Sequence, residues 1–415
     1  MNTSLAATLD RKPWTIALAV MGPGIIVMLA DTDAGSIITA AQSGAQWGYR
    51  LLLLQAILIP VLYVVQELTV RLGLVTGRGH GELIRQHFGS RWAWLSCSTL
   101  LLACIGALVT EFSGVAGVGK LFGIPAWASM TMVVGGMTAI IWTGSYRSVE
   151  RVAVAFGLFE LAFLYVALRS NPDPVALAAG IRQIPTDGKF FYLVAANIGA
   201  VIMPWMIFFQ QSAVVEKGLG PDYLRLARRE TAVGAVVTQL VMAAVLVAAA
   251  ATIGTSNPNA PLDTVQQISD TLVPFLGWKV GRAVFAAGML GAAMVAAIVV
   301  SLTAAWGVGE VAGYRRSLAD HPLDAPWFYG IVTGCLVLSG VLVASETINL
   351  IDLSVGIQVV NALLLPVVLG FLFALSRKAL PAPYRLTGPY AWLVGTIIVV
   401  TSAFGVFSGI FGIIG

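Results

Sequence analysis

Residues 22–49 read GPGIIVMLADTDAGSIITAAQSGAQWGY, and this stretch decides the fold. It is long and apolar enough to cross a bilayer as a helix, which takes about 20 residues. Near its middle, residues 31–36 (DTDAGS) place two carboxylates, two hydroxyl groups and a glycine at membrane depth. Unwound backbone inside a bilayer is stable only where protein buries it or where it lines a cavity. The stretch therefore predicts a membrane helix that breaks in the middle.

A second candidate break lies in residues 191–218, FYLVAANIGAVIMPWMIFFQQSAVVEKG. Asn197 and Gly199 precede Met203 and Pro204 in an otherwise apolar run. Proline removes a backbone donor and clashes with the preceding turn, and a glycine weakens a helix. This span is therefore also predicted to break at membrane depth.

The composition is that of a polytopic membrane protein. Of the 415 residues 58% are hydrophobic and only 11% are charged, far below the share in soluble domains. The sparse charge excludes a surface that follows a phosphate backbone, and so nucleic-acid binding. Cys97, Cys104 and Cys335 lie in apolar stretches without metal-site or disulfide spacing. No catalytic grouping of His, Asp or Ser is found either, so we expect neither an enzyme nor a bound cofactor.

Eleven apolar runs predict eleven spans, near residues 14–43, 50–75, 94–118, 123–143, 150–168, 190–215, 228–253, 281–308, 326–345, 351–376 and 387–413. With the N-terminus inside, 17 of the 24 basic residues fall in cytoplasmic segments, which predicts a cytoplasmic N-terminus and an external C-terminus. The first run is too long for a signal peptide, so we expect it to be retained.

The two breaks each begin a set of five spans, 14–168 and 190–376, and the span at 387–413 is extra. Because five is odd, the two sets have opposite topology. Broken helices at matching places of inverted repeats indicate a midplane binding site in a secondary transporter. The sequence therefore predicts an all-α integral membrane protein whose single transporter domain covers residues 1–415.

Asp33 is the sharpest candidate ligand. A carboxylate at the bilayer centre costs at least about 2.5–3.5 kcal/mol, which favours ion coordination over its alternative, a cap for the second half-helix. The role of Asp31 stays open. It would add a second carboxylate to the metal site, act as an outer-shell hydrogen-bond acceptor, or simply face an aqueous vestibule. Unwound backbone around Ala30 and Ala200 would offer carbonyl oxygens.

Ser36 would offer a hydroxyl group and Met203 a thioether. The oxygen ligands suit Mg²⁺, Mn²⁺ and Ca²⁺, whereas the thioether favours transition metals.

These stretches resemble the Nramp family of divalent metal transporters, whose first helix breaks at Asp-Pro-Gly-Asn. Residues 33–36 lie at that motif, and residues 200–205 (AVIMPW) resemble the family's Ala-x-x-Met-Pro-His. Residues 44–55, 71–83 and 110–125 resemble its first three spans, with weaker likeness at 300–310 and 357–366. The resemblance implies the leucine-transporter-type (LeuT) fold, alternating access, and a metal held by Asp33, the Asn position, Met203 and a carbonyl.

The chain departs from the family's motifs at five places. Ser36 replaces the Asn and Ala34 the Pro, Trp205 replaces the His, Gly114 replaces a second acid, and the ninth span has no arginine. The last three lie on the family's proposed proton route. The pattern is similar to the Nramp-related magnesium transporters, which implies import of Mg²⁺ and Mn²⁺ without proton coupling. The expected partners are divalent metal ions and the lipid bilayer of the cytoplasmic membrane, with no obligate protein partner.

Two other transport functions stay open, a proton-coupled Mn²⁺/Fe²⁺ symporter and a sodium-coupled amino-acid carrier, although Asp33 would repel the carboxylate of an amino acid. A receptor or scaffold would leave two broken helices unexplained. Further polar side chains have open roles. Glu111 is a relay or cavity acid, and Gln358 and Asn361 share one face of the tenth span and could approach the metal. Glu67 forms a helix pair with Arg71 or a gate contact, and Glu160 and Glu310 form structural hydrogen bonds or line the inner vestibule.

Overall fold

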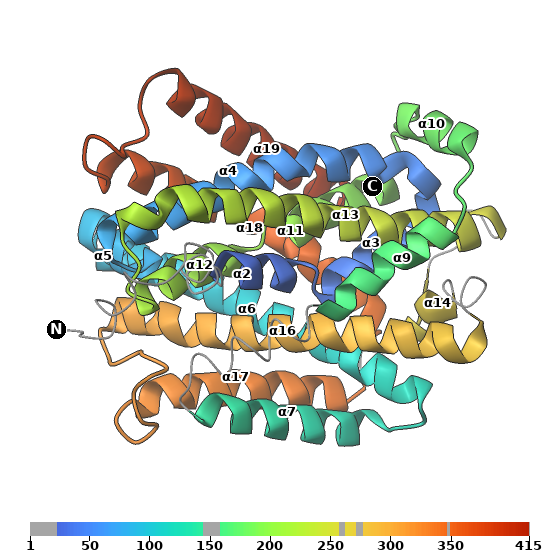
Figure 1. Cartoon of the computed structure of the whole chain (residues 1–415), viewed down its shortest axis with the longest axis horizontal. Helices are drawn as coiled ribbons and strands as arrows, with labels where there is room; N and C mark the ends of the chain where they lie inside the picture. Colours follow the sequence, from blue (N-terminus) through green and yellow to red (C-terminus); the bar gives the residue numbers. More distant parts are fainter. Residues whose placement is uncertain (1–22, 144–157, 257–261, 271–276, 347–348, 415) are drawn as a thin grey trace, which may run out of the picture.

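The computed structural model describes residues 23–143, 158–256, 262–270, 277–346 and 349–414, and this part is helical with no strand (Figure 1). In chain order the helices are α2 (Pro23–Asp31), α3 (Ala34–Trp47), η2 (Gly48–Leu51), α4 (Leu52–Thr76), α5 (His80–Phe88), α6 (Ser90–Leu121), α7 (Ala126–Trp142), η3 (Leu158–Leu161), α9 (Ala162–Arg169), α10 (Pro174–Arg182), α11 (Gly188–Val201), α12 (Pro204–Glu216), η4 (Pro221–Tyr223), α13 (Leu224–Ser256), α14 (Val265–Asp270), α16 (Trp278–Ala312), α17 (Pro326–Ala344), α18 (Leu350–Lys378) and α19 (Gly388–Ile414).

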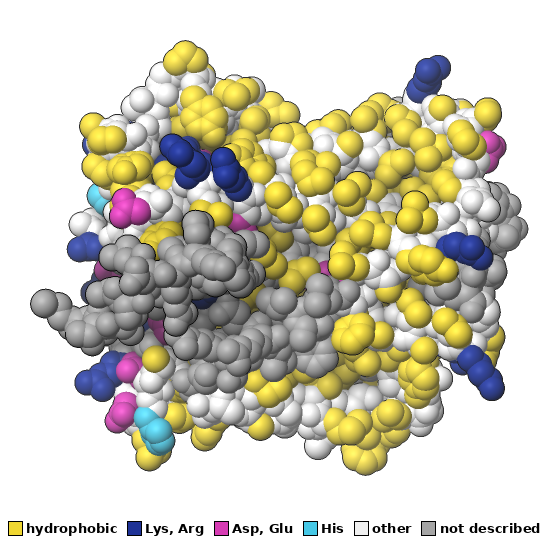
Figure 2. Space-filling model, in the orientation of Figure 1, with side chains coloured by type: hydrophobic (Ala, Val, Ile, Leu, Met, Phe, Trp, Pro, Cys, Tyr) yellow, Lys and Arg dark blue, Asp and Glu magenta, His cyan; other side chains and the backbone are white. Residues whose placement is uncertain are grey.

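The molecule is a multi-pass membrane protein. Eight described segments are long and apolar enough to cross a bilayer, and α7 is a shorter apolar helix. On the face shown in Figure 2, hydrophobic side chains are spread over the described surface between the two ends, whereas Lys and Arg lie toward those ends. The predicted runs at 14–43 and 150–168 begin in residues 14–22 and 150–157, which lie outside the described residues.

The connections between helices gather at two ends, named here the α5 end and the α10 end after the short helix at each (Figure 1). At the α5 end, Arg316 pairs with Glu82, and Arg71 donates to the carbonyl of Tyr384. At the α10 end, Arg50 donates to the side chain of Gln183. The predicted long connections 169–189 and 254–280 contain the short helices α10 and α14.

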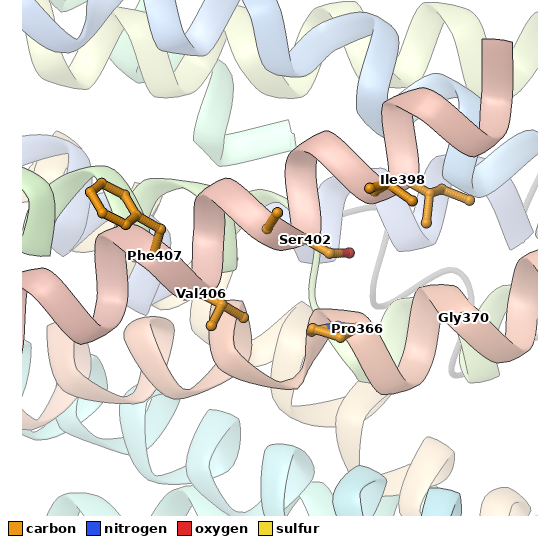
Figure 3. A pocket seen from close by; sticks show the side chains of 8 residues that line it. Pro366, Gly370, Ile398, Ser402, Val406 and Phe407 are labelled. Carbon is orange, nitrogen blue, oxygen red and sulfur yellow. The ribbon is translucent and has the colours of Figure 1, made fainter.

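A groove of about 580 Å³ lies between α18 and α19 (Figure 3). Its lining is mostly apolar and includes Pro366, Ile398 and Phe407, and more than half of the Phe407 side chain is exposed. None of the predicted metal ligands lines it. The groove lies on the outer surface of the helix bundle, so we place the functional site elsewhere.

Both predicted helix breaks are present, and they have the same form. α2 ends at Asp31 and α3 begins at Ala34, while α11 ends at Val201 and α12 begins at Pro204. Each break is therefore two residues long. Met203, the residue before Pro204, has the extended backbone that a following proline favours (ψ 139°). Proline fits the first position of a helix because no helical partner is needed there.

The breaks are narrower than the sequence suggested. Ala30 and Ala200, predicted to lie in unwound backbone, belong to the last turns of α2 and α11, and Ser36 belongs to the first turn of α3. The reason is capping, since Asp33 starts α3 immediately. Carbonyls of a last helical turn have no intrahelical partner, so the carbonyl oxygens of Ala30 and Ala200 remain candidate ligands.

Asn197 and Gly199 also lie inside an intact helix and do not form the break. The Asn197 side chain donates to the hydroxyl of Ser43 at 2.8 Å and accepts from the amide of Gln55 at 2.6 Å. These bonds join α11 to α3 and α4, which satisfies a polar side chain at membrane depth.

Candidate metal site

One hydrogen bond joins the two broken spans. The hydroxyl of Ser36, in the first turn of α3, donates to the carbonyl oxygen of Ala200, in the last turn of α11, at 3.0 Å. Both residues are fully buried. The bond places the two breaks side by side, so groups from either break share one region of the interior.

Asp33 performs one of its two predicted roles and remains available for the other. Its Oδ1 accepts from the backbone N–H of Ser36 at 2.6 Å, which caps α3. Its Oδ2 is buried and accepts no N–H or hydroxyl hydrogen bond in the described part of the chain, although the carboxyl group of Glu111 lies within hydrogen-bonding reach of Asp33. A buried carboxylate oxygen without a donor is destabilising unless a proton or a cation neutralises it. The cap therefore orients the carboxylate and leaves one oxygen for an ion.

Glu111 of α6 lies at the start of the same half-helix. Its Oε2 accepts from the backbone N–H of Ala34 at 3.0 Å, and its Oε1 accepts from the hydroxyl of Thr110 at 3.3 Å. Of the roles left open for Glu111, the structure supports that of a hydrogen-bonded cavity acid.

Gly114, one turn further along α6, explains how the helix comes so close. A Cβ atom there would lie 2.6 Å from the Cβ of Ala34, so a larger side chain would push α6 away from the break. The position of the family's second acid is thus filled by the packing of α3 against α6.

Gln358 of α18 contacts both broken spans. A Cβ atom at Gly35 would collide with the side-chain amide of Gln358, and a Cβ atom at Gly199 would collide with its backbone carbonyl. The Gln358 side chain also accepts from the amide of Asn361 at 2.9 Å. The sequence placed Gln358 and Asn361 on one face of the tenth span, and the structure brings Gln358 to the first break.

Met203 and Trp205 flank Pro204 at the second break, and both are fully buried. The indole Nε1 of Trp205 has no hydrogen-bond partner among the residues that the structure describes. Metal ligation by Met203 stays a prediction.

Asp31 and Glu160 lie at the other end of the first break. Asp31 is the last residue of α2, and the hydroxyl of the next residue, Thr32, bonds to the carboxylate of Glu160 in η3. Asp31 and Glu160 are both 1% exposed. The hydrogen-bonding role expected of Glu160 is confirmed, but its position beside the first break was not foreseen.

The half-helix α2 is held by α13. The backbone N–H of Ile25 donates to Glu230 at 2.8 Å, and Thr238 donates to the carbonyl of Met28 at 2.7 Å. Between them, a Cβ atom at Gly234 would lie 2.5 Å from the Cγ of Met28. A cavity of about 410 Å³ remains between the two helices. Sequence inspection missed these contacts, because Glu230 and Thr238 lie more than 200 positions away from the residues that they bind.

Buried glutamates are paired at the α5 end. Glu67 accepts from Arg71 at 2.6 Å and from Arg228 at 2.7 Å, which confirms the expected helix pair with Arg71. Glu310 accepts from the hydroxyl of Ser212 at 2.5 Å and from the N–H of Gly81 at 2.8 Å, so it is structural as expected.

His80, at the start of α5, is buried beside the side chain of Gln211. Burial lowers the pKa of His80 to about 4, while the hydrogen bond with Gln211 opposes the shift. The imidazole is therefore neutral near pH 7 and adds no positive charge to this end.

The donor set at the breaks is mixed. In the described ranges, no group of three or more His, Cys, Asp and Glu side chains is placed to hold a metal ion. A site there would combine one or two carboxylates with hydroxyl, carbonyl and thioether groups. Mg²⁺ and Mn²⁺ accept carboxylate, carbonyl and water ligands, so the residues present fit such ions.

Comparison with known proteins agrees with this reading of the fold. The sequence profile of the family described as natural resistance-associated macrophage protein-like (Nramp) matches residues 24–410. A relative named divalent metal cation transporter MntH, from Bradyrhizobium diazoefficiens, is 24% identical over an alignment 424 residues long. The alignment covers 96% of this chain and 91% of the relative. An MntH protein from Listeria welshimeri is 25% identical over 303 residues, covering 70% and 67% of the two chains.

Solved structures give the same fold. A manganese transporter of Eremococcus coleocola, in complex with an aromatic bis-isothiourea compound, superposes with a TM-score of 0.74 at 19% identity and covers 100% of this chain and 90% of that one. MhsT, in complex with L-phenylalanine, gives a TM-score of 0.63 at 13% identity, covering 94% and 98%. The predicted LeuT-type fold with broken first and sixth spans is thereby confirmed.

Proposed function

The chain belongs to the Nramp family, and from this premise we propose that it is a secondary transporter that imports the divalent ions Mg²⁺ and Mn²⁺ through the cytoplasmic membrane by alternating access. The observation that supports this most directly is the free Oδ2 of Asp33, buried at a helix break that touches the second break. Relatives named divalent metal cation transporters support the same substrate class.

The proposed ligands are Asp33, Ser36, Met203 and the carbonyls of Ala30 and Ala200. Ser36 is shorter than the family's Asn and already bonds to Ala200, so it leaves room beside the ion. Mg²⁺ sheds its water reluctantly, and a roomier site suits a partly hydrated ion. The free carboxylate oxygen of Asp33 disfavours the alternative of an amino-acid substrate, because like charges would meet.

We place the α5 end in the cytoplasm because most basic residues fall in its connections. The chain enters the first span at this end and α19 ends at the other, where a Cβ atom at Gly412 would lie 2.5 Å from the Cα of Tyr192, near the start of α11. The proposed repeats cover residues 14–168 and 190–376.

Competition tests the substrate class. Purified protein in liposomes should take up labelled Mn²⁺, and a large excess of unlabelled Mg²⁺ should block that uptake. Ca²⁺ at equal concentration provides a comparison within the hard cations. Mn²⁺ uptake that ignores Mg²⁺ at any concentration would contradict Mg²⁺ as a substrate and favour a Mn²⁺/Fe²⁺ carrier.

Met203→Ala should weaken the apparent affinity for Mn²⁺ more than that for Mg²⁺. A thioether gains more from the softer ion, whereas loss of packing would affect both ions equally. Met203→Leu keeps the volume and removes the sulfur, so it should show the same bias towards Mn²⁺ loss. Both affinities are measured in the same liposomes, and parallel losses would mean that Met203 only packs the break.

Metal influx should proceed without proton influx. Trp205 does not titrate, Gly114 carries no acid, and Glu111 accepts a backbone N–H at the break. A pH-sensitive dye inside proteoliposomes should therefore report no acidification while a Mn²⁺ gradient is applied at equal pH. Acidification that scales with Mn²⁺, vanishes in Asp33→Ala and persists at clamped membrane potential would establish coupling.

A further inference from the structure

We infer that the first break holds a second divalent-cation site, formed by the carboxylates of Asp31 and Glu160 at the C-terminal end of α2. This inference rests on the proposed function and adds a second ion to the same route. It assigns Asp31 to a site of its own instead of to the ligand set of Asp33.

The carboxylates of Asp31 and Glu160 are buried with too few hydrogen-bond donors. Both oxygens of Asp31 and the Oε1 of Glu160 are buried and have no hydrogen-bond partner within the described residues. The two side chains are each 1% exposed, and Glu160 contacts Thr32, the residue that follows Asp31. The other oxygen of Glu160 is held by Thr32, which fixes the carboxylate beside the break. Oxygens that are buried, oriented and without donors fit a cation.

The negative charge around the first break also favours a second cation. Four carboxylates surround the first break, and no Lys or Arg pairs with any of them in the described part of the chain, where the ion pairs lie elsewhere. A single divalent ion at Asp33 compensates two negative charges. Asp31 and Glu160 would then have no cation beside them at membrane depth, where unpaired charge is most expensive, and each would be neutral only by taking up a proton. A second divalent ion balances them.

The carboxylates of the first break lie in two pairs, one at each of the two helix termini that meet there. Asp33 and Glu111 lie at the N-terminus of α3, where free N–H groups stabilise negative charge, and each accepts one such N–H. Asp31 and Glu160 lie at the C-terminus of α2, where the helix dipole is negative and favours a cation. The two ends of one break therefore differ in what they bind best.

The chemistry suits a hydrated ion. Two carboxylates and a hydroxyl group supply too few ligands for a dehydrated site, and Mg²⁺ or Mn²⁺ bound by two carboxylates keeps several waters. Such a site would lie next to the Asp33 site, at the opposite end of the first break.

Counting bound Mn²⁺ on the full-length protein in detergent tests the inference. Free Mn²⁺ is followed by electron paramagnetic resonance during titration, and the wild-type chain should bind two ions. Glu160→Gln and, independently, Asp31→Asn should each bind one. Asp33→Ala should also retain one ion, the one held by Asp31 and Glu160. Glu346→Gln, which removes a half-exposed carboxylate on another surface, should still bind two.

The outcomes separate this inference from the proposed function. A wild-type chain that saturates at one ion, lost in Asp33→Ala, would overturn the second site and leave the transport proposal intact. Two ions retained in Glu160→Gln would also overturn the assignment. A wild-type chain that binds no Mn²⁺ and takes up none would overturn both. The wild-type count needs no variant, so a variant that fails to fold does not prevent the decision.

Discussion

Replacing Asp33 with alanine should abolish divalent-ion uptake while the protein still folds. The substitution removes the carboxylate whose Oδ2 faces no donor in the described structure. Loss of an outer-shell partner of a metal ligand already lowers affinity by about 10–100-fold, so loss of the ligand should lower Mn²⁺ uptake by more than about 100-fold. Uptake into liposomes, normalised to monodisperse protein, measures this.

The cap and the charge can be separated at this position. Asp33→Ala also removes the acceptor for the N–H of Ser36, which costs about 1 kcal/mol of helix stability. Asp33→Asn keeps a capping oxygen and removes the charge, so it should match the thermal stability of the wild type and still lose uptake. Asp352→Ala, an exposed carboxylate on α18, is the matched control and should transport normally. Normal uptake by Asp33→Asn would exclude a carboxylate ligand.

Among substitutions that add one methyl group in this region, Gly199→Ala should lower the stability of the protein most. The new Cβ atom would meet the backbone of α18, including the amide nitrogen of Ala362 at 2.7 Å. Backbone cannot move aside as a flexible side chain does, and overpacking costs about 1–3 kcal/mol or more. We expect a clear fall in melting temperature and weaker Mn²⁺ binding, because Gln358 would shift away from Gly35.

The same substitution elsewhere controls for helix propensity. Gly136 in α7 is exposed and has no atom within contact distance of a new Cβ, so Gly136→Ala adds the same methyl group without a collision. Alanine is favoured over glycine in a helix by about 1 kcal/mol, so this variant should melt at the wild-type temperature or above. Equal melting temperatures for the two variants would mean that α11 and α18 are not in backbone contact.

The two helix breaks were predictable because their causes are local. A carboxylate pair inside an apolar run and a proline after methionine are visible in any sequence, and both mark positions where a helix stops. The extent of each break was less predictable, because it depends on the cap that Asp33 provides and on the start that Pro204 provides. The sequence wrongly placed Asn197 in the second break, because a polar residue in an apolar span can also form hydrogen bonds between intact helices.

The contacts that build the site around the breaks were not predictable, because they join residues far apart in the sequence. Gln358 meets Gly35 and Gly199 only through the packing of α18, and Glu160 reaches Thr32 only through the placement of η3. A single glutamine or glutamate in an apolar span shows that a partner exists, and the fold alone shows which one. Two glycines without an obvious turn were the available signal for the close approach of α18.

The short length of α2 turns a small rotation into an opening. A helix of nine residues is roughly 13 Å long, so a tilt of about 25° at Thr32 and Asp33 would displace its first residue by roughly 6 Å, about two water diameters. Two hydrogen bonds from α13 and the packing of Met28 against Gly234 oppose that swing, and each hydrogen bond is worth only about 0.5–1.5 kcal/mol net. In the proposed cycle, an ion bound beside Asp33 would shift the balance between the two orientations of α2.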